Sequence, residues 1–182
     1  HGKVVLMDLI QVKNFRKSFG KKIVHSDVNV SLHENECLGL IGGSGTGKSV
    51  LLRSLIGLEK PDSGQILFGG KDITKFSEEE LIDVRRNIAY AFQGGALFDS
   101  MTVFDNLAYP LREHTNLSYK EISEKIHFQL GQFGLADSEH LYPGSLSGGM
   151  QKRVGLARAI ILGPNVILYD EPTAGLDPYN TK

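Results

Sequence analysis

The chain has one cysteine, no marked excess of either charge and no long apolar run, and each scarcity excludes a class of protein. With Cys37 alone, no internal disulfide can form, and a reducing cytosolic setting is the simplest expectation. Lys and Arg total 20 against 21 Asp and Glu, so no basic surplus indicates a nucleic-acid partner. No apolar run approaches the roughly 20 residues that span a bilayer, and no signal peptide is visible.

What is present is an ordinary globular composition. Hydrophobic residues make up 41% and charged residues 23% of the 182 residues, a balance that argues against disorder. This length allows one substantial core, or one domain with an inserted subdomain. We find no internal repeat, low-complexity stretch or obvious linker, so a single domain is expected.

The pattern changes along the chain from strands to helices and back to a strand. Alternating apolar and polar residues over 9–32 predict antiparallel strands, and the apolar run 37–41 predicts a buried strand. A helix over 48–56 follows. The later strands are expected over 65–68, over 88–92 and, buried, over 166–169. Two capping boxes, Ser77 with Glu80 and Ser118 with Glu121, each predict the start of a helix. Further helices are expected after the cap Thr102, ending before Pro110, and over 150–162.

A glycine-rich segment follows the predicted strand 37–41 and fits the phosphate-binding P-loop pattern G-x-x-x-x-G-K-[ST]. Glycines are needed because backbone amides must point inward around phosphates. Lys48 then places a cation at the β- and γ-phosphates, and the Ser49 hydroxyl ligates Mg²⁺. The alternative is a glycine-rich turn with an incidental lysine, which the flanking strand and helix disfavour. The segment consists of Gly42, Gly43, Ser44, Gly45, Thr46, Gly47, Lys48 and Ser49.

A second segment, 166–171, is apolar and ends in two acids. The carboxyl end of a buried parallel strand lies at the edge of the sheet where ligands bind. Asp170 suits Mg²⁺ coordination, directly or through water, and Glu171 suits polarising an attacking water. The alternative is a strand followed by an exposed acidic turn, and the upstream P-loop makes it the weaker interpretation.

A third segment, 146–150, opens a predicted helix. Ser147 can cap this helix, and Gly148 and Gly149 leave its first amides bare, which makes an anion site. Taken alone, the segment is better explained as an ordinary Ser-Gly-Gly helix start. Its position in a helical region, shortly before the acidic strand, favours the anion site instead.

The order of these segments resembles the ATPase subunits of ABC transporters over nearly the whole chain. Residues 42–49 match Walker A, 146–150 match the LSGGQ signature and 166–171 match Walker B. Gln93, after Ala91-Phe92, matches the Q-loop, and residues 174–177 match the D-loop. The combination is far more specific than any one motif.

The resemblance implies ATP and Mg²⁺ as cofactors and assigns roles to residues. Glu171, Lys48 and Gln93 are the implied catalytic residues, and Ser49, Gln93 and Asp170 are the implied metal ligands. Phe19 matches the aromatic position that stacks on adenine, and the alternative is a packing phenylalanine in the core or at a turn. The implied nucleotide-binding residues are Phe19, Gly42, Gly43, Ser44, Gly45, Thr46, Gly47, Lys48, Ser49, Val50, Gln93, Ser147, Gly148 and Gly149.

In this family the signature of one protomer completes the ATP site of the other, which implies a head-to-tail dimer with a second copy of the chain. Two departures from the family pattern are visible. The signature ends in Met150 rather than glutamine, and function is expected to survive because the Ser and Gly amides are intact. The sequence stops at Lys182, before the family's switch histidine, so we expect a truncated chain that binds nucleotide but hydrolyses it poorly.

Together these features predict an α/β fold of the ABC ATPase type: a P-loop NTPase core with a β-rich N-terminal subdomain and an inserted α-helical subdomain, truncated at the C-terminus. We expect one domain over 1–182. Within it, residues 1–93 form the β-rich and P-loop core, 94–162 the helical subdomain, and 163–182 the return to the core.

The region Gly94 to Thr115 resembles the ATPases of bacterial phospholipid transporters, the Mla-type systems that work with MCE-domain proteins. The runs 95–98 and 109–115, Val50 and the methionine-ended signature carry this resemblance. It implies a peripheral ATPase at the cytoplasmic face of the bacterial inner membrane that energises phospholipid transport. The implied partners are a membrane permease, received by the Gly94–Thr115 region, and indirectly an MCE-type lipid-binding protein, with no nucleic acid.

The permease-receiving groove is expected to be formed by exposed Leu97, Phe98, Met101 and Phe104. The alternative is that these side chains pack the helical subdomain's own core. Other functions also stay open. One alternative is an ABC ATPase that serves another solute, and only the resemblance of residues 94–115 argues against it. A non-transport ABC ATPase lacks support, since there is no basic excess, sustained heptad pattern or zinc-binding cysteine cluster. A catalytically silent module is disfavoured by the presence of Lys48 and Glu171.

Overall fold

The computed structural model describes residues 8–91 and 95–170, and the chain divides into two compact units, 1–85 and 86–182. The division falls within a helix, and the subdomain boundaries expected from the sequence at 93 and 162 stay predictions. Over the ranges 8–91 and 95–170, no helix is long and apolar enough to cross a membrane.

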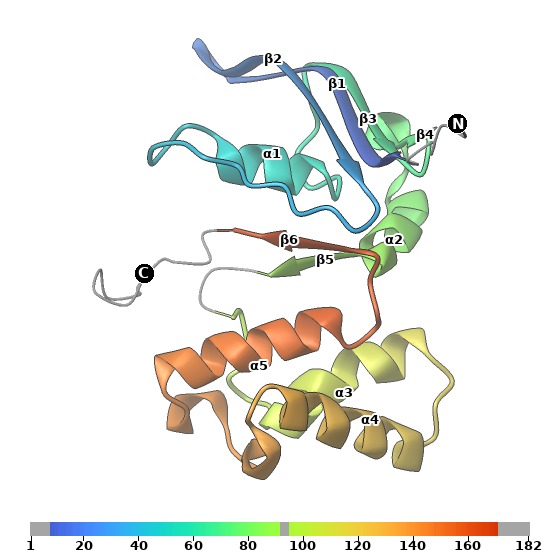
Figure 1. Ribbon diagram of the computed structural model, residues 1–182, viewed down its shortest axis with the longest axis vertical. Helices are drawn as coiled ribbons and strands as arrows, with labels where there is room; N and C mark the ends of the chain where they lie inside the picture. The colour runs from blue at the N-terminus through green and yellow to red at the C-terminus, as the bar shows by residue number, and fades with distance from the viewer. Residues whose placement is uncertain (1–7, 92–94, 171–182) are drawn as a thin grey trace, which may run out of the picture. The chain divides into compact units, whose positions relative to one another are not determined.

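An antiparallel sheet forms the framework of the first unit (Figure 1). Strands β1 (Asp8–Phe19) and β2 (Lys22–His33) make a hairpin, and β3 (Ser63–Phe68) pairs with the other edge of β1. The short β4 (Lys71–Asp72) follows β3, so the strand order is β2-β1-β3-β4. The antiparallel strands predicted over 9–32 and the strand predicted over 65–68 are therefore confirmed.

The first unit also contains α1 (Lys48–Ser54), the 3-10 turn η1 (Ile73–Lys75) and the start of α2 (Glu78–Asn87). The predicted capping box of α2 is present. The Ser77 amide donates to the Glu80 carboxylate at 2.8 Å, and the Glu80 amide donates to the Ser77 hydroxyl at 3.3 Å. Each residue thus satisfies a backbone N–H that the first helical turn leaves without a partner.

The buried strand predicted over 37–41 is not found. These residues belong to no ladder among the described strands, and Cys37 and Ile41 are exposed. Apolar composition indicates that a segment favours burial, but a strand exists only where a neighbouring strand supplies hydrogen-bond partners. The apolar pattern of residues 37–41 indicates a tendency to be buried, but it contains no information on whether a partner strand is present.

Helices build most of the second unit. Its long helices are α3 (Val103–His114), α4 (Tyr119–Gln132) and α5 (Gly148–Ile160), with the 3-10 turns η2 (Ala136–Ser138) and η3 (Pro143–Ser145) between α4 and α5. They enclose one apolar core. Its buried residues are Val103, Leu107, Ala108, Leu111, Ile122, Ile126, Leu130, Leu135, Leu146, Val154, Ala157 and Ile161.

A parallel strand pair lies beside these helices in the second unit (Figure 1). β5 (Ile88–Ala91) and β6 (Val166–Tyr169) pair in register, with Ile88 opposite Val166. Only one face of β6 is buried, because Val166 and Leu168 are enclosed while Ile167 and Tyr169 are each 43% exposed. The strand predicted over 166–169 is present, but its burial alternates, as expected of a pleated strand with one covered face.

Caps fix where α3 and α4 begin. The Thr102 hydroxyl accepts from the Asp105 amide at 3.1 Å, which confirms the predicted cap of α3. Ser118 and Glu121 form the second predicted capping box, in which the Ser118 amide donates to the Glu121 carboxylate at 2.7 Å.

Helix α3 does not end before Pro110, contrary to expectation, but runs on to His114 with the proline inside it. A proline in a helix interior costs about 3 kcal/mol through the lost hydrogen bond and ring clash. The apolar face of α3 continues past the proline, and Leu111 is fully buried in the core. Burying one leucine contributes roughly 1.5–3 kcal/mol, so packing on the far side of Pro110 offsets the cost.

Candidate functional site

The predicted P-loop is an exposed turn that leads directly into α1. The Lys48 ammonium donates to the carbonyl oxygens of Gly42 at 2.6 Å and Gly43 at 2.9 Å. The Thr46 hydroxyl also donates to the Gly43 carbonyl, at 2.9 Å. The loop therefore folds around the side chain of its own lysine, and the cation lies against the glycine backbone.

Gly47, the N-cap of α1, has a left-handed backbone with φ 95° and lies tightly against β2. A Cβ atom at this position would lie 2.3 Å from Val24 Cγ1 and 2.7 Å from His25 Nε2. Only glycine meets both the backbone conformation and the close approach. His25 Nε2 lies 2.9 Å from the Gly47 carbonyl oxygen, and because that oxygen can only accept, the histidine nitrogen donates. No role was assigned to His25 from the sequence, so this contact was missed.

Ser49 and Val50 are half-buried in the first turn of α1, whereas Ser44 and Thr46 are exposed in the loop. The Ser49 hydroxyl is an oxygen donor of the kind that Mg²⁺ prefers. With Lys48 between the glycines and Ser49, the chemistry of the segment fits a nucleotide phosphate group and its metal.

Phe19 ends β1 and is 47% exposed, so it is not a core residue. The Lys17 ammonium lies 5.0 Å from the centroid of its ring, a cation–π contact. The exposure leaves the ring accessible, as adenine stacking requires. That role stays a prediction.

The predicted signature opens α5 in the expected way. The Ser147 hydroxyl accepts from the Met150 amide at 3.3 Å and caps the helix. Gly148 and Gly149 are exposed, and a Cβ at either would meet no atom within 4 Å. The start of this 13-residue helix therefore presents amides without covering side chains, which is the property of an anion-binding helix end.

Met150 departs from the family's glutamine, and the fold gives it a packing role. Its side chain is partly buried against the core of the second unit. The neighbouring Gln151 instead donates through its side-chain amide to the carbonyls of Pro143 at 2.9 Å and Leu146 at 3.3 Å. These contacts fix the turn that precedes Ser147.

Asp170 follows β6 directly, at the carboxyl end of the parallel strand pair. Its amide donates to the Ala91 carbonyl at 3.3 Å, and its carboxylate accepts from the Tyr90 hydroxyl at 2.7 Å. Tyr90 was not singled out from the sequence. The sequence held no signal for it, because the contact depends on the pairing of β5 with β6, which lie far apart along the chain.

The segment after the Q-loop is held to α5 by Arg158. Its guanidinium donates to the Ala96 carbonyl at 2.9 Å and to the buried Asn106 side chain at 3.3 Å, and it lies 5.3 Å from the Phe98 ring centroid. Burial lowers the pKa of Arg158, because desolvation disfavours the charged form. Asn106 in turn binds both the amide and the carbonyl of Phe98.

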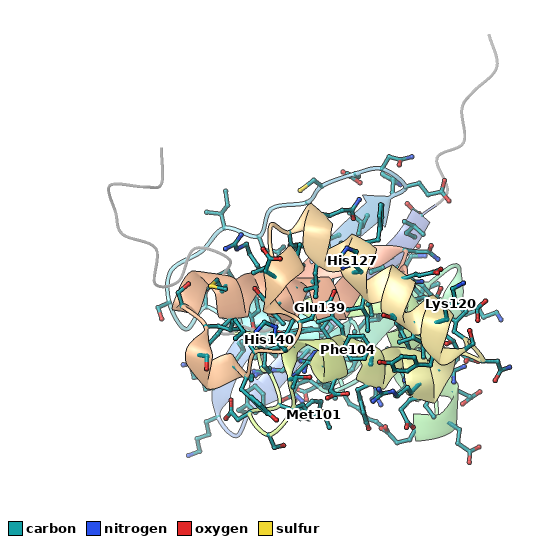
Figure 2. All side chains as sticks on the ribbon, turned by 90° about the horizontal axis from the view of Figure 1, so that it is seen from below. Met101, Phe104, Lys120, His127, Glu139 and His140 are labelled. Carbon is teal, nitrogen blue, oxygen red and sulfur yellow. The ribbon has the colours of Figure 1, made fainter. Side chains whose placement is uncertain are left out.

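The four apolar residues expected to form a groove differ in burial, and Met101 is half-buried. Leu97 and Phe104 are partly buried against the helical core, as the packing alternative predicts. Phe98 is 44% exposed and packs edge-on against Tyr109, with ring centroids 5.6 Å apart. Figure 2 looks onto the helical unit from below and labels Met101 and Phe104.

The site residues fall in different parts of the chain. Phe19 and the segment 42–50 belong to the first unit, whereas Asp170 and the Ser147 helix start belong to the second. Gln93, Glu171 and the D-loop segment 174–177 lie outside the described residues. Over the described ranges, no cluster of three or more histidine, cysteine or carboxylate side chains is arranged to hold a metal.

Several named proteins are similar to this chain. The "Probable ribonucleotide transport ATP-binding protein mkl" of Mycobacterium leprae is 47% identical over 180 residues, covering 99% of this chain and 52% of its own length. The "Intermembrane phospholipid transport system ATP-binding protein MlaF" of Haemophilus influenzae is 41% identical over 171 residues, covering 94% of this chain and 65% of its own length. This chain thus spans about half the length of the mycobacterial relative.

Among solved structures, cbiO1 of Clostridium perfringens, part of the ABC transporter complex cbiONQ, superposes with a TM-score of 0.84 at 29% identity. The match covers 94% of this chain and 68% of that chain, and it confirms the predicted α/β ABC ATPase fold. The family model described as ABC transporter matches residues 25–174, a range that includes the P-loop, the signature and Asp170. On these grounds, and on the geometry of its P-loop and signature helix, this chain belongs to the ABC transporter ATP-binding family.

Proposed function

We propose that this chain is the ATP-binding and ATP-hydrolysing subunit of an ABC transporter. The observation that carries the proposal is the P-loop, in which the Lys48 ammonium donates hydrogen bonds to the carbonyls of Gly42 and Gly43. A glycine loop that leads into a helix, with a lysine at the junction, is built to hold a polyphosphate. The close packing of Gly47 against β2 supports this assignment, because no larger residue fits there.

The described oxygen donors also suit a magnesium ion bound with the nucleotide. The Ser49 hydroxyl and the Asp170 carboxylate are hard ligands, and Gln93 is a third candidate from the resemblance. A bound Mg²⁺ would neutralise charge on the β- and γ-phosphates. Lys48 would bind and orient the same phosphates, and Glu171 would accept the proton of the attacking water. Phe19, exposed at the end of β1, would stack on the adenine.

The proposal includes a second copy of the chain, arranged head to tail. The bare amides at Gly148 and Gly149 form an anion site at the start of α5. In the proposed dimer, Ser147 and these amides reach the nucleotide held by the partner's P-loop. Water would then be excluded from the γ-phosphate, which strengthens its electrostatic stabilisation during hydrolysis.

Phospholipid is the proposed cargo. The Haemophilus relative is named for intermembrane phospholipid transport, and residues 94–115 resemble such ATPases. The mycobacterial relatives, named for ribonucleotide transport, support a second candidate because they are more similar to this chain, at 47–48% identity. These two cargoes require different transport assays, so an experiment can separate them.

The proposed location is the cytoplasmic face of a bacterial inner membrane, with a permease docked on the region Gly94–Thr115 and an MCE-type lipid-binding protein as a further, indirect partner. The exposed rings of Phe98 and Tyr109 provide apolar surface in that region. The Arg158 contacts that hold Ala96 and Phe98 support a surface of fixed shape.

Reconstitution tests the proposed function. The whole protein is assembled with its co-purified permease in vesicles that contain labelled phospholipid or labelled ribonucleotide. We expect ATP-dependent movement of phospholipid and none in a Lys48→Ala complex. ATP-dependent movement of ribonucleotide alone would replace the proposed cargo with the second candidate. An assembled complex that does not hydrolyse ATP would refute the enzymatic proposal itself.

A further inference from the structure

We infer that Tyr90 is a positioning residue for Asp170 and that its hydroxyl tunes how the carboxylate binds magnesium. The inference rests on the proposed function, because it takes Asp170 as a ligand of the metal that accompanies ATP. It goes beyond that function by assigning a role to a residue of β5 that matches none of the family motifs noted above.

Strand pairing brings the two side chains together. Tyr90 lies opposite Leu168 in the parallel pair of β5 and β6, which lie side by side in Figure 1. Side chains two residues apart along a strand share a face, so Asp170 follows Leu168 on the face of Tyr90. The long phenol side chain spans this diagonal, and its hydroxyl reaches Asp170 Oδ2 at 2.7 Å.

A second bond fixes the backbone of the acid. The Asp170 amide donates to the Ala91 carbonyl at 3.3 Å, one residue past the strand pair. Adjacent residues of β5 thus bind the main chain and the side chain of Asp170. Two attachment points restrict both the position of its Cα atom and the rotation of its carboxylate.

The hydrogen bond suits a metal ligand chemically. A phenol O–H that donates to a carboxylate makes a charge-assisted bond, which is shorter and stronger than a neutral one. A carboxylate offers about four acceptor positions on its two oxygens, so the bond at Oδ2 is compatible with metal ligation. A residue that hydrogen-bonds a metal-ligating side chain and orients it typically raises metal affinity by about 10- to 100-fold.

The variant Tyr90→Phe separates positioning from packing, because it keeps the ring and removes only the donor. Mn²⁺ binding is followed by electron paramagnetic resonance on the whole protein with a non-hydrolysable ATP analogue. We expect Mn²⁺ affinity to fall by about 10- to 100-fold. Binding of the same analogue in EDTA, and the melting temperature, are expected to stay at the wild-type values. A loss of packing would lower the melting temperature instead.

Two further variants complete the test. Tyr119→Phe removes a hydroxyl from an exposed residue of α4 and serves as the matched control, with Mn²⁺ affinity unchanged. In an Asp170→Ala background, adding Tyr90→Phe is expected to cause no further loss, because the oxygen that accepts from the Tyr90 hydroxyl is gone. An equal loss in both backgrounds, or wild-type Mn²⁺ affinity in Tyr90→Phe, overturns the inference. A wild-type protein without metal-dependent nucleotide binding overturns the proposed function as well, which distinguishes the two failures.

Discussion

At the scale of single residues, the proposed nucleotide binding depends most on Lys48. Its ammonium donates to the Gly42 and Gly43 carbonyls and is the cation proposed to bind a phosphate. Lys48→Ala is therefore expected to abolish ATP binding, because it removes the cation that offsets phosphate charge in a largely backbone-lined cradle. Isothermal titration measures the affinity. Lys120→Ala, which removes an exposed lysine 3.9 Å from Glu124, is the control, and an unchanged affinity in Lys48→Ala would contradict the P-loop assignment.

Glu121 gives a residue-scale prediction of pH dependence. Hydrogen bonds from the Ser118 side chain and then the Ser118 backbone hold the pKa of its carboxyl below the ordinary value. A carboxyl with a lowered folded-state pKa stabilises the fold above its unfolded-state pKa, and this stabilisation is lost as pH falls through the folded value. The stability difference between wild type and Glu121→Ala is expected to be full at neutral pH and to shrink in acid. Urea denaturation at several pH values measures it, with Glu124→Ala as the control. A difference that grows on acidification would contradict the assignment.

At the scale of elements, the contact between α5 and the segment after the Q-loop depends on two glycines. A Cβ at Gly155 would lie 2.4 Å from the Gly95 Cα atom, too close for any real contact. Gly155→Ala is expected to destabilise the fold by about 1–3 kcal/mol through overpacking. Gly131→Ala in α4 is the matched control, since open space surrounds that position, and it is expected to stabilise by about 0.5–1 kcal/mol. Urea denaturation measures the free energy of unfolding of both variants. Equal changes in the two variants would contradict the close contact between Gly155 and Gly95.

At the scale of the whole molecule, the proposal predicts assembly controlled by nucleotide. Glu171→Gln is expected to retain ATP binding, because the amide is nearly isosteric, but to lose the base that activates water. The variant is therefore expected to accumulate as an ATP-bound dimer, visible by light scattering of the whole protein in saturating Mg-ATP. A strict monomer, with or without permease, would refute the shared site.

Ser147→Arg gives the complementary whole-molecule prediction. The arginine places bulk at the exposed start of α5, where the proposed dimer admits the partner's nucleotide. Hydrolysis is expected to fall while nucleotide binding by the monomer is spared, because in the proposal Ser147 contacts only the nucleotide held by the partner's P-loop. Measuring both quantities on one preparation separates the two effects. A parallel loss of binding would place Ser147 next to its own P-loop.

Local patterns were sufficient for the elements whose causes are local. The capping residues Ser77, Thr102, Ser118 and Ser147 each accept the hydrogen bond expected of them, because a cap involves only neighbours along the chain. The antiparallel strands predicted over 9–32 formed for a similar reason, since a short turn joins β1 directly to β2 along the chain. The motif positions of Lys48 and Asp170 were likewise visible as spacing alone.

Tertiary structure decided whatever depended on a distant partner. Pro110 stays inside α3 because Leu111 is buried in a core to which other helices contribute, and the residues 37–41 form no strand because none of the described strands pairs with them. The bond from Tyr90 to Asp170 joins residues 80 positions apart and exists only because β5 and β6 pair. The sequence by itself determined the family and the caps, and it predicted the motif chemistry. The fold determined which side chains support that chemistry, because hydrogen bonds and packing between distant segments depend on position in space.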